Sequence, residues 1–137
     1  MLRADDIIIA AMRYVGVPFH HQGRNRKHGL DCIGLIVVVL DDLGITVKDT
    51  TTYRNPPDQR QFLECVKTQA KEKPIADRRP SDLLLIAPRR LIHHAAIMIS
   101  EGEIIHVDSA RGVEVVGLTA WAGRIRSCFD LRGLDVQ

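Results

Sequence analysis

The sequence predicts an α+β domain in which N-terminal helices pack on a mainly antiparallel sheet of five to six strands. Three observations indicate this class. Apolar residues recur with the helical period near the N-terminus, a capped apolar run follows, and short strand-like segments occupy the chain from residue 80 onward. The chain has 137 residues, of which 45% are apolar, so we expect a single domain over residues 1–137 that is large enough to bury a core.

The first expected helix spans residues 4–15. Gly16 ends it, and Pro18 prevents it from resuming. A polar loop over residues 19–30 follows and carries three of the six histidines. The apolar stripe that we expect to be the buried face of this helix consists of Ile7, Ile8, Ala11, Met12 and Val15.

The second expected helix begins after Asp31 and ends before Gly44. Its apolar run, residues 33–40, is rich in β-branched side chains, and propensity alone favours a strand there. Asp31 is a good N-cap and Gly44 a good C-terminal stop, so the flanking residues favour a helix.

The later elements are shorter. Residues 45–59 are turn-rich, and residues 61–71 form a short amphipathic helix. The strands expected after Pro80 are residues 82–87, 91–100, 103–109, 113–118 and 124–131.

Composition argues against several classes of protein. The net charge is only +2 and aromatic residues make up 4%, which gives little support for nucleic-acid binding. The longest apolar run is far shorter than the roughly 20 residues that a membrane-spanning helix needs. We expect no secretory signal, because Asp5 and Asp6 lie where its apolar stretch would be, and three widely spaced cysteines do not favour a disulfide framework. We therefore expect synthesis in a reducing cytoplasm and no membrane insertion.

Cys32 is the central candidate for chemistry, because it occupies the expected first turn of a buried helix. Exposed amides and the helix dipole stabilise negative charge there, so we expect a lowered thiol pKa. The neighbouring Asp31 opposes this effect unless its side chain turns away to cap the helix. The alternative interpretation is that Cys32 is a small buried hydrophobic residue.

Two histidines lie on one expected β-hairpin. A three-residue loop over residues 100–102, with Gly102 in the left-handed conformation, pairs Ile99 with Glu103 and Ala96 with His106. His94 and His106 are then diagonal neighbours on one face, while His93 points to the other. Cys32, His94 and His106 thus supply a nucleophile, a base and an orienting group. A zinc site could use the same residue types, but no Cys-x-x-Cys or His-x₃-His spacing is present, and we expect no metal and no cofactor.

With these residues identified, the chain resembles the NlpC-type cell-wall cysteine peptidases, a papain-like family of bacteria and phages. The family's Asp-Cys-x-Gly motif is matched at residues 31–34, and its Pro-Gly-Asp-Leu turn at residues 80–83. Its two histidine-bearing strands are matched at residues 94–98 and 105–107. The resemblance implies a papain-like fold with Cys32 as nucleophile, His94 as base and His106 as orienting residue. It also implies that the Cys32 amide helps to bind the oxyanion.

The resemblance is more specific to the phage-tail branch of this family, through residues 16–22 and the segment from Trp121 to Leu134. It implies cleavage of peptidoglycan stem peptides at the D-γ-glutamyl–diaminopimelate bond. It further implies a place in the virion tail, with tail hub or tail-tip proteins as partners.

Departures from the family pattern affect the expected substrate and oxyanion contacts, which involve Asp31, Phe19, His20 and Ile33. Phe19, or His20 if the loop shifts, stands where the family often has tyrosine. Ile33 replaces a serine that helps to hold the substrate amine, and Ser81 replaces the turn glycine. Two alternatives remain open: a structural tail protein that retains the fold without activity, and acyl transfer or amide hydrolysis on another substrate.

Overall fold

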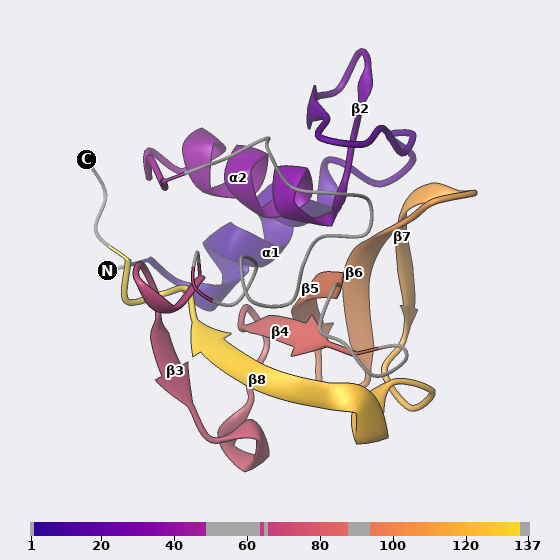
Figure 1. Ribbon diagram of the computed structural model, residues 1–137. Helices are drawn as coiled ribbons and strands as arrows, with labels where there is room; N and C mark the ends of the chain where they lie inside the picture. Colours follow the sequence, from indigo (N-terminus) through magenta and orange to yellow (C-terminus); the bar gives the residue numbers. More distant parts are fainter. Residues whose placement is uncertain (1, 49–63, 65, 88–93, 135–137) are drawn as a thin grey trace.

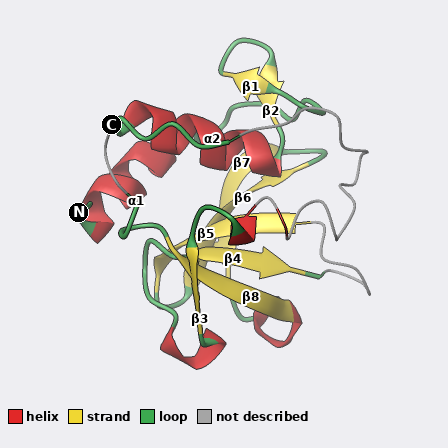
Figure 2. Ribbon diagram, turned by 60° about the vertical axis from the view of Figure 1, so that its left-hand side comes forward, coloured by secondary structure: helices red, strands yellow, loops and turns green. Residues whose placement is uncertain are grey.

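A computed structural model describes residues 2–48, 64, 66–87 and 94–134, and its architecture confirms the predicted α+β class. In these residues two helices, α1 (Ala4–Met12) and α2 (Cys32–Asp42), lie together on one side of a six-stranded sheet, as Figure 1 and Figure 2 show. Neither helix has the length and apolar character that crossing a membrane requires, a finding that covers the described residues alone.

Antiparallel pairing joins all six strands of the sheet. Five of the strands were predicted, with bounds close to those observed, although residues 91–93 of the predicted strand 91–100 lie outside the described part. The sixth, β3, was not predicted. In spatial order the strands are β3 (Lys71–Lys73), β8 (Ile125–Asp130), β4 (Leu83–Ile86), β5 (His94–Ser100), β6 (Glu103–Asp108) and β7 (Gly112–Gly117).

Smaller elements differ from the prediction or fall outside it. A helix over residues 61–71 is wrong at its end, because β3 begins at Lys71; residues 61–63 and 65 lie outside the described part. The expected loop before α2 contains a small ribbon of β1 (Arg24–Asn25) and β2 (Gly29–Leu30). Short 3₁₀ turns occur as η1 (Ile75–Asp77) and η2 (Ala122–Arg124).

The buried face of α1 differs from the predicted stripe. Ile7 and Ala11 are buried as expected, but the helix ends at Met12, and both Met12 and Val15 are exposed. The buried stripe continues instead to Tyr14, whose hydroxyl donates a hydrogen bond of 2.5 Å to Asp42 Oδ2 on α2.

The sheet has a core on each face, because alternate residues of its central strands point in opposite directions. Leu83 and Leu85 pack with the residues of α1 and α2, whereas Leu84 and Ile86 pack in a second cluster. All four side chains of β4 are therefore buried. The second cluster also includes Met98, Ile104, Leu118, Ile125 and Cys128, with Trp121 packed against it.

The β5–β6 hairpin keeps most of the predicted register. Ile97 pairs with Ile105, which is the register that also brings His106 opposite Ala96. The turn itself differs: Ser100, not Ile99, pairs with Glu103, because the register shifts by one residue near the turn. Gly102 is not among the residues with positive φ, so the predicted left-handed glycine was wrong.

Candidate active site

Cys32 is the first residue of α2, as the sequence predicted. Its side chain is buried, with 7% of its surface exposed. Its sulfur lies close to the backbone N–H groups of Ile33 and of Cys32 itself, at the start of the helix, and to that of Ala95 in β5. The thiol is therefore held between the first turn of α2 and the strand that begins with His94. Cys32 and Cys128 are both present as thiols.

The expectation of a lowered thiol pKa at Cys32 was wrong. Burial raises the pKa of Cys32 to about 12, and the negative charge of Asp31 also raises it. The nearby N–H groups lower it, but burial outweighs them because removing an ion from water is costly. Cys32 is consequently a neutral thiol at neutral pH, and its reaction as a nucleophile requires a base.

Both carboxylate oxygens of Asp31 accept hydrogen bonds within the protein. Its Oδ1 accepts a hydrogen bond of 2.7 Å from the Gly34 amide, which caps α2, and one of 3.0 Å from Arg24 Nη1. Its Oδ2 accepts a hydrogen bond of 2.9 Å from the Gln22 amide. These contacts join the loop before β1 to the start of α2, so Asp31 positions the Cys32 backbone.

A close backbone contact requires glycine at the last position of the Asp-Cys-x-Gly motif, which is Gly34. A Cβ atom on Gly34 would lie only 2.0 Å from the carbonyl oxygen of Gly23, which is far inside van der Waals contact. Only glycine lets the loop pass this close to the first turn of α2. The motif thus combines a helix cap, a thiol and a close backbone approach within four residues.

His94 and His106 meet on adjacent strands, as predicted. His94 Nε2 and His106 Nδ1 are 2.7 Å apart, and the two rings are nearly perpendicular at 87°. His106 is buried with 4% of its surface exposed, and the ring centroid of Trp121 lies 6.2 Å from that of each histidine. His93 lies outside the described residues, so its predicted direction stays a prediction.

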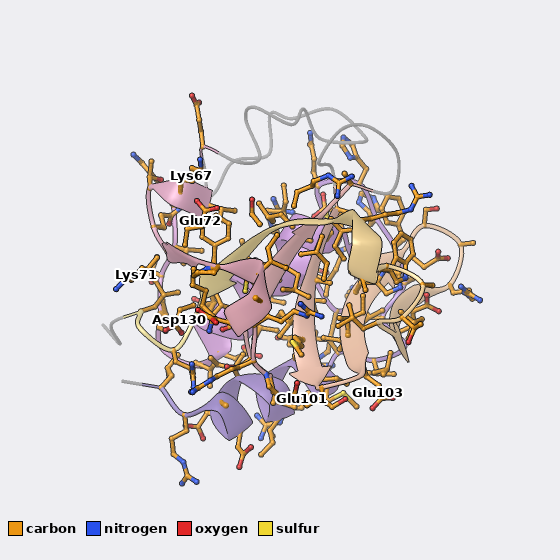
Figure 3. All side chains as sticks on the ribbon, turned by 90° about the horizontal axis from the view of Figure 1, so that it is seen from below. Lys67, Lys71, Glu72, Glu101, Glu103 and Asp130 are labelled. Atoms are coloured by element: carbon orange, nitrogen blue, oxygen red, sulfur yellow. The ribbon has the colours of Figure 1, made fainter. Side chains whose placement is uncertain are left out.

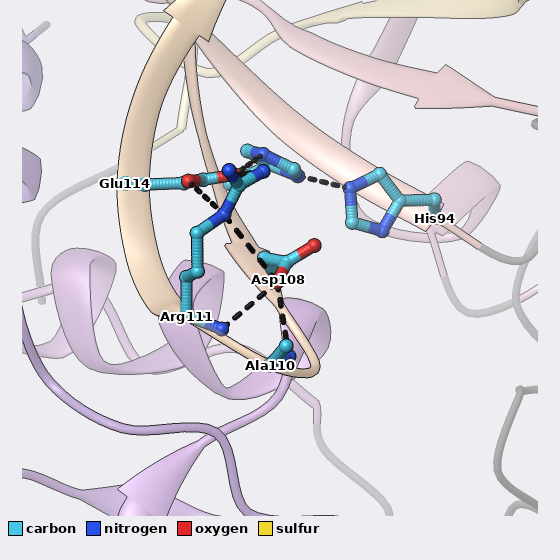
Figure 4. Close-up of polar contacts among 6 residues, drawn as sticks. His94, Asp108, Ala110, Arg111 and Glu114 are labelled. Carbon is cyan, nitrogen blue, oxygen red and sulfur yellow. Dashed lines mark hydrogen bonds and ion pairs between the residues drawn. The ribbon is translucent and has the colours of Figure 1, made fainter.

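The sequence analysis did not predict a second hydrogen-bond partner of His106. Glu114 is the cross-strand partner of His106 in β7, and its Oε2 lies 2.8 Å from His106 Nε2. Arg111 Nε lies 3.0 Å from Oε1 of the same carboxylate. Figure 4 shows the resulting chain of contacts from Arg111 through Glu114 and His106 to His94.

The other predicted substrate residues are placed as follows. Phe19 is half-buried against the core and forms a backbone bridge with Leu30. His20 is exposed, and its Nδ1 lies 2.9 Å from the carbonyl oxygen of His21. Ile33 and Ala95, the residues that follow Cys32 and His94, line an apolar cavity of about 70 Å³. The contacts of these residues with a substrate stay predictions.

The turn that matches the Pro-Gly-Asp-Leu motif has both strain and a buried charge. Ser81 has a φ of +85°, a conformation that glycine adopts without strain, and its hydroxyl is buried without a hydrogen-bond partner among the described residues. Asp82 is fully buried and forms an ion pair of 2.7 Å with Lys73. The Cys128 thiol donates to the same carboxylate at 3.5 Å.

No three His, Cys, Asp or Glu side chains come together as a metal-binding group within residues 2–48, 64, 66–87 and 94–134. The polar side chains that meet there are instead two imidazoles and a carboxylate, and the Cys32 thiol contacts the backbone of Ala95, the residue after His94. These are the groups of nucleophilic catalysis in which a base activates a cysteine.

Comparison with known families shows to which family the chain belongs. The model of the NlpC/P60 family matches residues 16–133, and the chain therefore belongs to the NlpC/P60 family. No curated protein matches the chain.

Solved structures share the fold at low sequence identity. The NlpC/p60 domain of the peptidoglycan hydrolase SagA is 20% identical, with a TM-score of 0.73, over 95% of this chain and 100% of that chain. The peptidoglycan hydrolase RipB from Mycobacterium tuberculosis is 18% identical, with a TM-score of 0.69, over 94% of this chain and 64% of that chain.

A third similar structure is RipD, also from Mycobacterium tuberculosis, described as a non-catalytic NlpC/p60 domain protein adapted to peptidoglycan binding. It is 17% identical, with a TM-score of 0.65, over 96% of this chain and 99% of that chain. The same fold thus occurs with and without catalysis.

Proposed function

We propose that the protein is a cysteine endopeptidase that cleaves the stem peptides of peptidoglycan. The observation that carries this proposal is the 2.7 Å contact between His94 and His106, next to the strand backbone that the Cys32 sulfur contacts. Family membership supports it, because similar structures of the family include peptidoglycan hydrolases.

In the proposed reaction, the Cys32 thiol gives its proton to His94 Nδ1 as the sulfur attacks the carbonyl carbon of the scissile amide. Backbone N–H groups at the start of α2, including that of Cys32, stabilise the oxyanion of the tetrahedral intermediate. His94 then gives the proton to the leaving nitrogen, and the C–N bond breaks to form a thioester. Water, activated by His94, hydrolyses the thioester and restores the thiol.

The proposed bond joins D-γ-glutamate to diaminopimelate. Mass spectrometry of muropeptides after incubation with the protein identifies the bond cleaved. We expect new stem-peptide fragments with the wild type and none with Cys32→Ala. Cys128→Ala is the matched control, because it removes a second buried thiol from the other core of the sheet, and it should keep the activity. Equal loss of activity in both variants would contradict the assignment of Cys32.

We also propose that a phage tail, through its hub or tip proteins, delivers the domain to the cell wall. The support is the resemblance of residues 16–22 and 121–134 to the phage-tail branch. Antibodies against the protein are expected to label one end of purified virions. Virions that lack the protein, although infected cells contain it, would exclude this location.

A second candidate function is a tail-tip protein that retains the fold to bind peptidoglycan without cleaving it. The likeness to the non-catalytic RipD and the raised pKa of Cys32 favour this alternative. It predicts co-sedimentation with purified cell-wall sacculi, no release of fragments, and normal infection by phage with Cys32→Ala. Fragment release that depends on Cys32 would exclude it.

A further inference from the structure

Glu114 contacts the buried end of the histidine pair and restricts where its protons lie. Its Oε2 is 2.8 Å from His106 Nε2, while Arg111 Nε is 3.0 Å from its Oε1. A carboxylate paired with arginine can only accept hydrogen bonds. His106 Nε2 must therefore carry a hydrogen, which it donates to Glu114.

The position of that hydrogen determines the state of His94. A neutral imidazole has one N–H, so His106 with its hydrogen on Nε2 has a lone pair at Nδ1. His94 Nε2, 2.7 Å away, then donates its own hydrogen to that lone pair. The other nitrogen of neutral His94, Nδ1, consequently has the lone pair that a base needs to accept the thiol proton.

The opposite tautomers would disable the base. A hydrogen on His106 Nδ1 would make His94 Nε2 an acceptor and would put the hydrogen of neutral His94 on Nδ1. That form of His94 cannot take a proton from Cys32. In serine proteases, replacing the carboxylate that fixes the histidine tautomer by an amide lowers kcat by about 10⁴.

We propose that Glu114, held by Arg111, is a positioning residue that fixes the tautomer of His106 and, through it, that of His94. The inference rests on the proposed role of His94 as the base. The turn between β6 and β7 supports this arrangement, because Asp108 Oδ2 accepts hydrogen bonds of 2.9 Å from the Ala110 amide and 2.8 Å from the Arg111 amide (Figure 4). The backbone from which Arg111 extends is thus fixed.

The test compares Glu114→Gln with the wild type and with Glu101→Gln. Glutamine has the shape of glutamate, but its amide can either accept a hydrogen bond from His106 or donate one to it. It therefore no longer selects one tautomer. Glu101 is exposed at the outer end of the β5–β6 hairpin (Figure 3), so the control removes the same charge away from the histidines.

Nitrogen-15 spectra of the histidine rings report the tautomers without any substrate. They are recorded at a pH where the spectra show both rings neutral. We expect His106 to be protonated on Nε2 in the wild type and in Glu101→Gln, and Glu114→Gln to show a mixture with the Nδ1 form. On a stem-peptide substrate, kcat of Glu114→Gln should fall by about 10- to 100-fold with KM little changed. Glu114→Asp, which keeps the charge, should restore part of kcat.

Two results would overturn the inference: a wild-type His106 protonated on Nδ1, or a folded Glu114→Gln protein with unchanged ring spectra. Circular dichroism establishes that each variant is folded, and Glu114→Asp provides a second variant. A protein with the expected spectra that releases no peptide fragments would overturn the proposed peptidase function instead, and would leave the tautomer assignment intact.

Discussion

Gly34→Ala tests whether the close approach of the Gly23 carbonyl oxygen to the first turn of α2 is the reason for a glycine at position 34. Helix propensity alone predicts a gain, because alanine is better than glycine inside a helix by about 1 kcal/mol. The new Cβ would, however, lie 2.0 Å from the Gly23 carbonyl oxygen, whereas ordinary contacts begin at 3.4 Å. The loop must therefore withdraw by about 1.4 Å.

A shift of that size lengthens the contacts that hold Asp31, which are 3.0 Å from Arg24 and 2.9 Å from the Gln22 amide. Overpacking costs about 1–3 kcal/mol, and each lost hydrogen bond to a charged group costs about 1.5–3 kcal/mol. The steric term exceeds the propensity gain. We expect Gly34→Ala to lower the free energy of unfolding by about 2–4 kcal/mol.

Urea unfolding followed by circular dichroism measures this change, with the m-value checking that the transition is unaltered. The matched control is Gly123→Ala in η2, where nothing lies within 4 Å of the added methyl group. Its stability should stay within about 0.5 kcal/mol of the wild type. A Gly34→Ala protein as stable as the wild type would refute the reasoning, because it would mean that the loop yields without losing its contacts.

Three further predictions concern Asp82 and the residues around it, which are Ser81, Lys73 and Cys128. Ser81→Gly should raise the free energy of unfolding by about 1 kcal/mol, because it relieves a positive φ and removes a buried, unpartnered hydroxyl; urea unfolding measures it, and a destabilised variant would contradict it. Lys73→Met should lower the free energy of unfolding by about 3 kcal/mol, because it leaves the buried Asp82 carboxylate without its cation. The double variant Lys73→Met/Asp82→Asn should recover part of this loss. A double variant with no recovery would count against a stabilising ion pair. Burial raises the pKa of Cys128 from 9.0 to about 12, so the folded thiol stays protonated where the unfolded one ionises. The part of the free energy of unfolding that comes from the protonated Cys128 thiol is complete below pH 9 and should decline by about 1.4 kcal/mol per pH unit from pH 9 to 12. The free energy of unfolding of Cys128→Ala should decline less steeply over this range. An unchanged slope of stability against pH would contradict the assignment to Cys128.

The helix at Cys32 could be predicted because its ends carry more information than its middle. Residues 33–40 favour a strand by composition, yet the Asp31 side chain accepts from the Gly34 amide and thereby fixes the start of a helix. The buried face of α1 could not be predicted in the same way. Two stripes of that segment have the same period, and which one is buried depends on tertiary packing, of which the contact between Tyr14 and Asp42, 28 residues away, is one example.

The histidine pair was predicted from the sequence, whereas its carboxylate partner was missed. His94 and His106 belong to one hairpin with a short turn, so the sequence alone limits their register. The position of Glu114 opposite His106 depends on the register of the next hairpin, formed by β6 and β7, where Asp108 pairs with Gly112 and His106 with Glu114. Gly112 has a φ of +79°, and a glycine at that point is the signal that would have located the turn and with it Glu114.

The raised thiol pKa explains why the base and its tautomer matter so much in the proposed reaction. A thiol whose pKa burial raises to about 12 is protonated at neutral pH. A resting thiolate therefore contributes little, and the proton must leave Cys32 as the sulfur attacks. Proton transfer of this kind needs a correctly oriented lone pair on His94, which the contacts of His106 and Glu114 provide. Burial of the nucleophile and the extended chain of partners behind the base are thus two parts of one arrangement.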